Sequence, residues 1–153
     1  DDVESRGLGD VYKRQDMGIE TVIGPATGGI ILSQVTARLL GVRSIFTERE
    51  NGKMTLRRGF KVAPGEKVLI VEDIVTTGGS IKEVVDVVNE AKGDIVGIGL
   101  LVDRSGGKAD FGVPQEKVYP LLHLTVPTYK PEECPLCKEG APITERGSHH
   151  LKK

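Results

Sequence analysis

The sequence of 153 residues has no tryptophan, few phenylalanines and tyrosines, and only two cysteines. A core must therefore be built mainly from aliphatic side chains. A disulfide framework is excluded because the two cysteines form a single C-x-x-C pair, and this cysteine usage predicts a cytoplasmic protein. No apolar run reaches the length of a transmembrane helix. The formal net charge of −1 argues against a general nucleic-acid binder, and no membrane partner is expected either.

Glycine is abundant, with 20 residues, and one stretch concentrates the informative signals. Residues 68–71 are four consecutive apolar residues, which predicts a strand buried on both faces of a parallel sheet. Glu72 and Asp73 follow where that strand leaves the core, and this edge is where open α/β sheets bind ligands. Residues 76–80 then form a turn rich in hydroxyls and glycines. The stretch predicts a binding site at the end of a central strand.

A helix is expected to begin at Ser80, because Ser80 and Glu83 fit the S-x-x-E capping box. A loop of hydroxyls and glycines at a helix N-terminus binds anions, most often phosphate, and neighbouring carboxylates suit the hydroxyls of a sugar. The alternatives are plain N-capping by the hydroxyls and an ordinary acidic turn. Apolar residues recur at helical spacing after the turn, at Ile81, Val84, Val85 and Val88.

The remaining pattern alternates strands, loops and helices, which predicts right-handed βαβ units and a parallel sheet. Three loops should then share one edge of the sheet: residues 24–29, 72–80 and 103–107. Residues 48–59 are expected to be a charged loop. Strands are predicted at residues 21–23, 42–47, 94–102 and 118–126, and a helix at about 30–40 with Ile31, Val35 and Leu39 on one face.

The chain is predicted to hold one domain, at residues 16–130. Residues 1–15 lack clear periodicity, and 10–15 resemble a translated sequencing-library adaptor, so 1–15 are expected to be a non-native or disordered leader. Residues 131–153 are expected to be a tail containing prolines and the cysteine pair. Two nucleotide motifs are missing: there is no G-x-x-x-x-G-K-[ST], and no G-x-G-x-x-G follows a strand.

The run VLIVEDIVTTGGS at 68–80 resembles the signature of the type I phosphoribosyltransferases. The resemblance implies their α/β fold, a mainly parallel sheet flanked by helices. It also implies an N-terminal hood segment that covers the base, which the sequence as given is expected to lack. Within that family the chain is most similar to the members that use orotate, and the residues carrying this likeness are 24–29, 46–59 and 102–107.

The resemblance implies a pentosyltransferase that moves ribose 5-phosphate from 5-phosphoribosyl 1-diphosphate (PRPP) to orotate. The products would be orotidine 5′-monophosphate and pyrophosphate, in pyrimidine biosynthesis, with Mg²⁺ held mainly through PRPP and no direct protein ligand. A homodimer is implied, in which the 48–59 loop acts in the neighbouring site. The alternatives are transfer to a purine and a non-catalytic regulatory protein of the same fold.

Roles for individual residues follow from the same resemblance. Lys53 and Asp73 are the implied catalytic residues. Orotate is expected to contact Thr76 and Arg104, since a guanidinium fork suits a planar carboxylate. The implied pyrophosphate loop is Ala26, Thr27, Gly28 and Gly29. The residues implied to bind PRPP are Arg49, Lys53, Glu72, Asp73, Ile74, Val75, Thr76, Thr77, Gly78, Gly79 and Ser80.

Several of these residues also have simpler interpretations. A charge run such as the 48–59 loop is usually a solvated face, and the roles of Arg57 and Arg58 there stay open. Arg104 could instead be a surface arginine paired with Asp103. Cys134 and Cys137 could supply half of a zinc site, form a redox-labile pair or have no special role.

Overall fold

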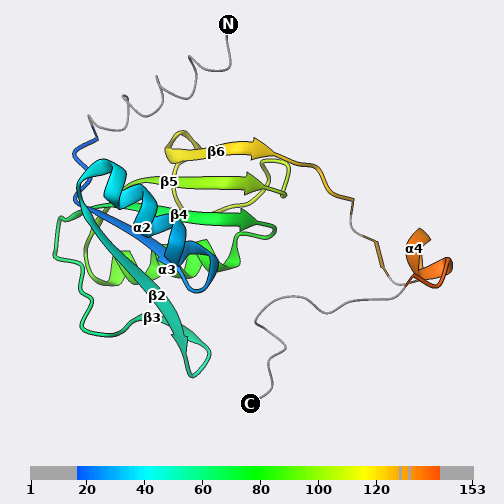
Figure 1. Cartoon of the computed structure of the whole chain (residues 1–153), viewed down its shortest axis with the longest axis horizontal. Helices are drawn as coiled ribbons and strands as arrows, with labels where there is room; N and C mark the ends of the chain where they lie inside the picture. The colour runs from blue at the N-terminus through cyan, green and yellow to red at the C-terminus, as the bar shows by residue number, and fades with distance from the viewer. Residues whose placement is uncertain (1–16, 128, 131, 142–153) are drawn as a thin grey trace, which may run out of the picture.

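A computed structural model describes residues 17–127, 129–130 and 132–141. Its framework is a six-stranded sheet with the strand order β3-β2-β1-β4-β5-β6 (Figure 1). All neighbouring strands are parallel except β2 and β3, which are antiparallel. The predicted mainly parallel α/β fold is therefore confirmed. The strands are β1 Thr21–Pro25, β2 Arg43–Glu50, β3 Lys53–Leu56, β4 Lys67–Val75, β5 Asp94–Asp103 and β6 Val118–His123.

Strand β4 lies in the middle of the sheet, paired with β1 on one side and β5 on the other. Its apolar run is buried on both faces: Val68 and Ile70 are fully buried, and Leu69 is 1% exposed. A continuous apolar run is what a strand covered by helices on both sides requires. The run predicted from the sequence is thus the centre of the fold.

Two helices cover the sheet, α2 (Gly28–Leu40) on one face and α3 (Gly79–Glu90) on the other (Figure 1). Each helix has its own layer of core. The larger layer includes Ile81, Val84 and Val88 of α3. The smaller layer, under α2, includes Ala37 together with residues of β1 and β4. Both faces of the sheet are therefore covered along the apolar run of its central strand.

The apolar face of α2 points away from the sheet. Ile31, Val35 and Leu39 share one face as predicted, but they are 75%, 50% and 79% exposed. The buried residues of this helix are instead small: Gly29, Ser33 and Ala37. Small side chains let the helix backbone lie close to the sheet, so the inward face is set by size and not by the largest apolar residues.

The charged segment 48–59, predicted to be a loop, is mostly a β-hairpin. Glu50 of β2 pairs with Lys53 of β3 across a two-residue turn. The turn residues Asn51 and Gly52 have φ of 52° and 83°. Positive φ at both positions is the requirement of the tight hairpin turn that Asn-Gly favours. The loop prediction is wrong because it relied on the run of charges and gave too little weight to the Asn-Gly pair, which is a hairpin signal.

The predicted capping box at Ser80 and Glu83 is also wrong. Helix α3 begins one residue earlier, at Gly79, and its N-cap is Gly78 with φ of 83° and no side-chain cap. A Cβ at Gly78 would lie 2.9 Å from Cε1 of the buried Phe111, so only glycine fits that turn. The Glu83 carboxylate is directed to the hairpin instead, where it meets Arg49.

The C-terminal part differs from the prediction in two ways. Strand β6 ends at His123 and not at 126, although Leu124 still donates a backbone hydrogen bond to the Asp103 carbonyl at 2.8 Å. A short helix, α4 (Pro135–Lys138), was not predicted, and a 3-10 turn covers Gln115–Lys117. Within the described ranges, no helix combines the length and apolar character of a membrane span. The predicted leader at 1–15 lies outside the described residues.

Candidate active site

The three predicted loops meet at one edge of the sheet, because each follows a parallel strand. Loops 24–29 and 72–80 touch directly: a Cβ placed on Gly28 would lie 2.3 Å from Oδ2 of Asp73. The third loop joins through its backbone, where the Arg104 N–H donates to the Val75 carbonyl at 2.8 Å. The shared edge is therefore observed, and it includes the C-terminal end of the central strand.

Two adjacent carboxyl groups lie near the C-terminal end of this strand, which continues to Val75, and their environments differ. Glu72 is 7% exposed, whereas Asp73 is half-buried. Burial raises the pKa of Glu72 to about 8, and a hydrogen bond to Asp73 and repulsion from its charge add to the effect. The Asp73 carboxylate accepts the Ile74 N–H at 2.7 Å. At neutral pH Glu72 is therefore largely protonated.

This arrangement predicts a pH dependence of stability. Because the pKa of Glu72 rises from 4.5 unfolded to about 8 folded, its contribution is fully present below pH 4.5 and is lost as the pH passes 8. A Glu72→Gln variant, always neutral, should therefore gain stability over the parent as the pH rises. Melting temperatures at pH 5, 7 and 9 should show a gap that widens by a few degrees. A gap that stays constant would contradict this assignment.

The turn after the carboxylates has the features of an anion cradle. Backbone N–H groups of residues 77–80 donate no hydrogen bond to any other described residue. Together they begin α3, so the helix dipole adds a partial positive charge there. A small cavity of about 70 Å³ lies within this turn. Of the residues of this loop predicted to bind the donor, all but Asp73 line the cavity: Glu72, Ile74, Val75, Thr76, Thr77, Gly78, Gly79 and Ser80.

The glycines of loop 24–29 permit a close approach of two chain segments. A Cβ on Gly24 would lie 2.5 Å from the carbonyl oxygen of Gly29, and one on Gly29 would lie 2.8 Å from Pro25. The peptide bond between Ala26 and Thr27 is cis. The loop is consequently a tight backbone turn that presents exposed residues 26–28 to the same edge as Asp73.

Asp103 organises the third loop and does not pair with Arg104. Its carboxylate accepts the N–H groups of Ser105 at 2.7 Å and Gly107 at 3.0 Å, and lies 3.3 Å from Nδ1 of His123. Burial opposes ionisation, but these hydrogen bonds and His123 outweigh it and hold the pKa of Asp103 below its ordinary value. Within the described residues Arg104 has no ion pair, so the interpretation as a partner of Asp103 is wrong.

A cleft of about 510 Å³ lies beside the turn and is lined by Arg104. Thr76 and Thr77 line both this cleft and the small cavity. The two spaces are therefore neighbours that share a wall. Sequence reasoning missed other lining residues, Lys108, Ala109, Thr125, Val126 and Pro127. The cation two residues after Gly106 was an available signal for Lys108, whereas nothing in the local pattern indicated 125–127.

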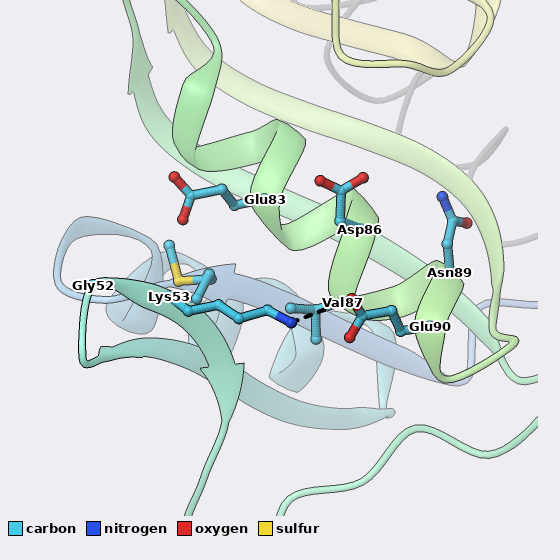
Figure 2. A pocket seen from close by; sticks show the side chains of 8 residues that line it. Gly52, Lys53, Glu83, Asp86, Val87, Asn89 and Glu90 are labelled. Carbon is cyan, nitrogen blue, oxygen red and sulfur yellow. Dashed lines mark hydrogen bonds and ion pairs between the residues drawn. The ribbon is translucent and has the colours of Figure 1, made fainter.

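The predicted cations of the hairpin line neither the small cavity nor the cleft. Figure 2 shows Lys53 beside α3, with its ammonium 3.4 Å from Glu90. Arg49 meets Glu83 of the same helix through two nitrogens, at 2.7 and 2.8 Å. Arg57 and Arg58 pair with Glu48. The hairpin thus lies over its own α3 across a hollow of about 520 Å³, with Lys53 and Arg49 bound to carboxylates of that helix.

An anion cradle at the carboxyl edge of a parallel sheet, beside a cleft lined by an arginine, is typical of enzymes that act on sugar phosphates. The family described as "Phosphoribosyl transferase domain" matches residues 10–111, which is two thirds of the chain. The chain belongs to the phosphoribosyltransferase family.

Its relatives narrow the assignment to the orotate phosphoribosyltransferases. The protein of that name from Thermotoga maritima is 56% identical over 151 residues, covering 99% of this chain and 78% of its own. The one from Desulforamulus reducens is 57% identical over 137 residues, covering 90% and 70%. The resemblance seen in the sequence is therefore confirmed at the level of this branch.

Solved structures support the fold. Adenine phosphoribosyltransferase from Rhodothermus marinus superimposes with a TM-score of 0.60 at 23% identity, covering 74% of each chain. A purine phosphoribosyltransferase from Pyrococcus horikoshii gives 0.59 at 18% identity, covering 80% of this chain and 89% of that one. At such low identity these likenesses concern architecture alone.

Proposed function

We propose that this chain transfers ribose 5-phosphate from PRPP to orotate, giving orotidine 5′-monophosphate and pyrophosphate in pyrimidine biosynthesis. The observation that carries the proposal is the wall of Thr76 and Thr77 shared by the anion cradle and the Arg104 cleft. A molecule with a phosphate in one space can place its sugar carbon at the mouth of the other. The names of the relatives agree with orotate as the acceptor.

The chemistry requires a sugar ring to become cationic as its bond to pyrophosphate breaks. In the proposed mechanism the free N–H groups of residues 77–80 hold the 5′-phosphate. Glu72 and Asp73 bind the ribose hydroxyls, and the charge of Asp73 favours the oxocarbenium-like ring. Orotate lies in the cleft with its carboxylate on Arg104. Catalysis consists mainly of positioning the two substrates and stabilising charge.

Mg²⁺ is the proposed cofactor, and it would neutralise the charge of the diphosphate. Mg²⁺ in phosphate chemistry is typically held by substrate oxygens and one or two carboxylates. The exposed loop 26–28 and the Asp73 carboxylate, which lie side by side, suit a metal carried in by PRPP. The cytoplasm is the proposed location, in keeping with the free thiols of Cys134 and Cys137.

We also propose a homodimer in which Lys53 and Arg49 serve the neighbouring site. Both side chains are bound to α3 of their own subunit. Exposed ion pairs of this kind contribute little to stability, so the hairpin can break them at a small cost in free energy. The hairpin projects from the edge of the sheet that carries β3 (Figure 1). A second copy could therefore receive it without disturbing the core.

Replacing Arg104 by Ala should weaken orotate selectively. A bidentate, charge-assisted contact is worth enough to raise the KM for orotate about 10- to 100-fold. The KM for PRPP should change less than about threefold, because the cradle and the carboxylates remain. Steady-state kinetics with each substrate varied in turn measures both constants.

Two further variants sharpen this test. Arg104→Lys keeps the charge but loses the planar fork, and should recover only part of the orotate affinity. Arg38→Ala removes an exposed arginine from α2, and both constants should stay as in the parent. Equal losses for orotate and PRPP in Arg104→Ala would refute the assigned role, and efficient transfer to a purine but not to orotate would refute the proposed function.

A further inference from the structure

The cysteine pair lies in a turn that is built by its own backbone. The Cys134 N–H donates to the Lys130 carbonyl at 2.9 Å, and the Cys134 carbonyl accepts the Lys138 N–H at 3.1 Å. The Leu136 carbonyl accepts the Ala141 N–H at 2.9 Å. Backbone hydrogen bonds thus fix the chain both before and after the cysteine pair. The position of the two sulfurs is set locally, independently of the sheet.

The turn places both cysteines on one side. Cys134 is the N-cap of α4, Pro135 is the first helical residue, and Cys137 follows one turn later. Residues three apart on a helix have Cβ atoms about 5–6 Å apart. A disulfide needs Cβ atoms about 3.5–4.5 Å apart, so a small local adjustment closes the bond. Cys134 is half-buried and Cys137 is exposed, so small reagents reach both.

The two sulfurs are chemically unequal. Hydrogen bonding from the backbone N–H and the thiol of Cys137, and from the Leu136 N–H, lowers the pKa of Cys134. The same thiol contact raises the pKa of Cys137. A thiolate is the nucleophile in disulfide exchange, whereas a neutral thiol reacts slowly. Cys134 therefore has the properties of the attacking sulfur, and Cys137 those of the resolving one.

We propose that Cys134 and Cys137 form a redox-active dithiol that exchanges with low-molecular-weight disulfides. The Cys134 thiolate attacks one sulfur of the disulfide, forming a mixed disulfide and releasing one thiolate. Cys137 then loses its proton to solvent and attacks the Cys134 sulfur. This forms the Cys134–Cys137 bond and releases the second thiolate, so the two cysteines are oxidised and the reagent is reduced to two thiols.

Two thiols could alternatively hold a soft metal ion. Tetrahedral zinc sites use four ligands. Among the described residues, no group of three or more His, Cys, Asp and Glu side chains gathers in one place. The pair accordingly offers two ligands where four are needed, and the dithiol chemistry is complete within one turn. This inference does not depend on the proposed transferase activity.

The test is a thiol count on the intact protein. The reduced chain is incubated with glutathione disulfide, quenched with an alkylating reagent and weighed by mass spectrometry. The parent should change from two alkylated cysteines to none, with the loss of two hydrogens and no glutathione attached. A chain that keeps two alkylatable thiols, ends with two glutathione adducts or forms covalent dimers would overturn the proposal. So would thiols that react only after a chelator has been added.

Two matched variants test whether Cys134 is the attacking sulfur and Cys137 the resolving one. In Cys137→Ser, the Cys134 thiolate has no resolving partner, so a single glutathione adduct should accumulate. In Cys134→Ser, the remaining Cys137 should form its adduct about tenfold more slowly at neutral pH. Both variants keep one thiol in the same exposed turn, so a difference in folding cannot produce the contrast. Equal rates would overturn the assignment of Cys134 as the attacking sulfur.

Discussion

Replacement of Asp73 by Asn is expected to lower kcat about 100- to 1,000-fold at neutral pH, the usual cost of removing one group that stabilises transition-state charge. The physical reason is that Glu72, with a pKa of about 8, is largely neutral at pH 7, so stabilising the cationic ring falls to Asp73. Asn retains the shape and can still accept the Ile74 N–H. Steady-state kinetics at pH 7 and a melting curve separate lost chemistry from lost folding.

Glu72→Gln is the matched control for this prediction. Because Glu72 is largely protonated at pH 7, its amide analogue should cost only a fewfold there. At pH 9 the parent gains a second charge that the variant cannot gain, and the deficit of Glu72→Gln should grow. If the two substitutions lowered kcat equally at pH 7 and at pH 9, the different roles assigned to the two carboxylates would be contradicted.

Replacement of Gly28 by Ala is expected to lower kcat about 100-fold, although the added methyl group has no chemistry. The new Cβ would lie 2.3 Å from Oδ2 and 2.6 Å from Cγ of Asp73. No carbon atom tolerates such distances, so the carboxylate must move. Misplacing a catalytic group by about 1 Å has a cost of this order. The measurement is kcat for the variant and its parent under saturating substrates.

A double-mutant cycle tests whether Gly28 acts through Asp73. In an Asp73→Ala background the carboxylate is gone, so adding Gly28→Ala should cost almost no further activity. Gly28 begins α2 with ordinary helical backbone, so alanine there should raise the stability of that background by up to about 1 kcal/mol. Multiplicative losses of kcat in the cycle would show that the methyl group acts elsewhere.

Much of the fold could be predicted because its strands are long apolar runs with strong turn signals between them. The central strand, the order of strand and helix, and the edge shared by three loops all followed from that pattern. Errors arose where two signals competed. Charges concealed the Asn51-Gly52 hairpin, and the capping-box spacing at Ser80 concealed the glycine turn at Gly78.

The orientation of α2 shows a limit of periodicity. Ile31, Val35 and Leu39 have the spacing of a buried face, yet the sheet is met by Gly29, Ser33 and Ala37. Hydrophobicity alone ranks the faces in the wrong order here, because close packing against the sheet depends on side-chain size. The small residues Gly29, Ser33 and Ala37, four apart, are the sequence signal for the face that meets the sheet.

The candidate site was predictable in its residue types but not in its internal contacts. Glu72, Asp73 and the 76–80 turn follow directly from one motif. The contact of Gly28 with Asp73 and the loop-organising role of Asp103 depend on long-range geometry that no local pattern encodes. The distribution of charge between Glu72 and Asp73 depends on burial. These contacts and this difference in burial could be obtained only from the structure.

The strand order has a consequence for biosynthesis. Strand β4 pairs with β1, from which β2 and β3 separate it in the chain, and with β5, which follows it. While the chain is being translated, β4 leaves the ribosome before β5, with one edge of its most apolar segment unpaired. Such edges invite association with other chains. The cleft lined by Arg104 cannot form beside the anion cradle until the end of β5 has emerged. Binding that uses both spaces can therefore add stability only after β5 has formed.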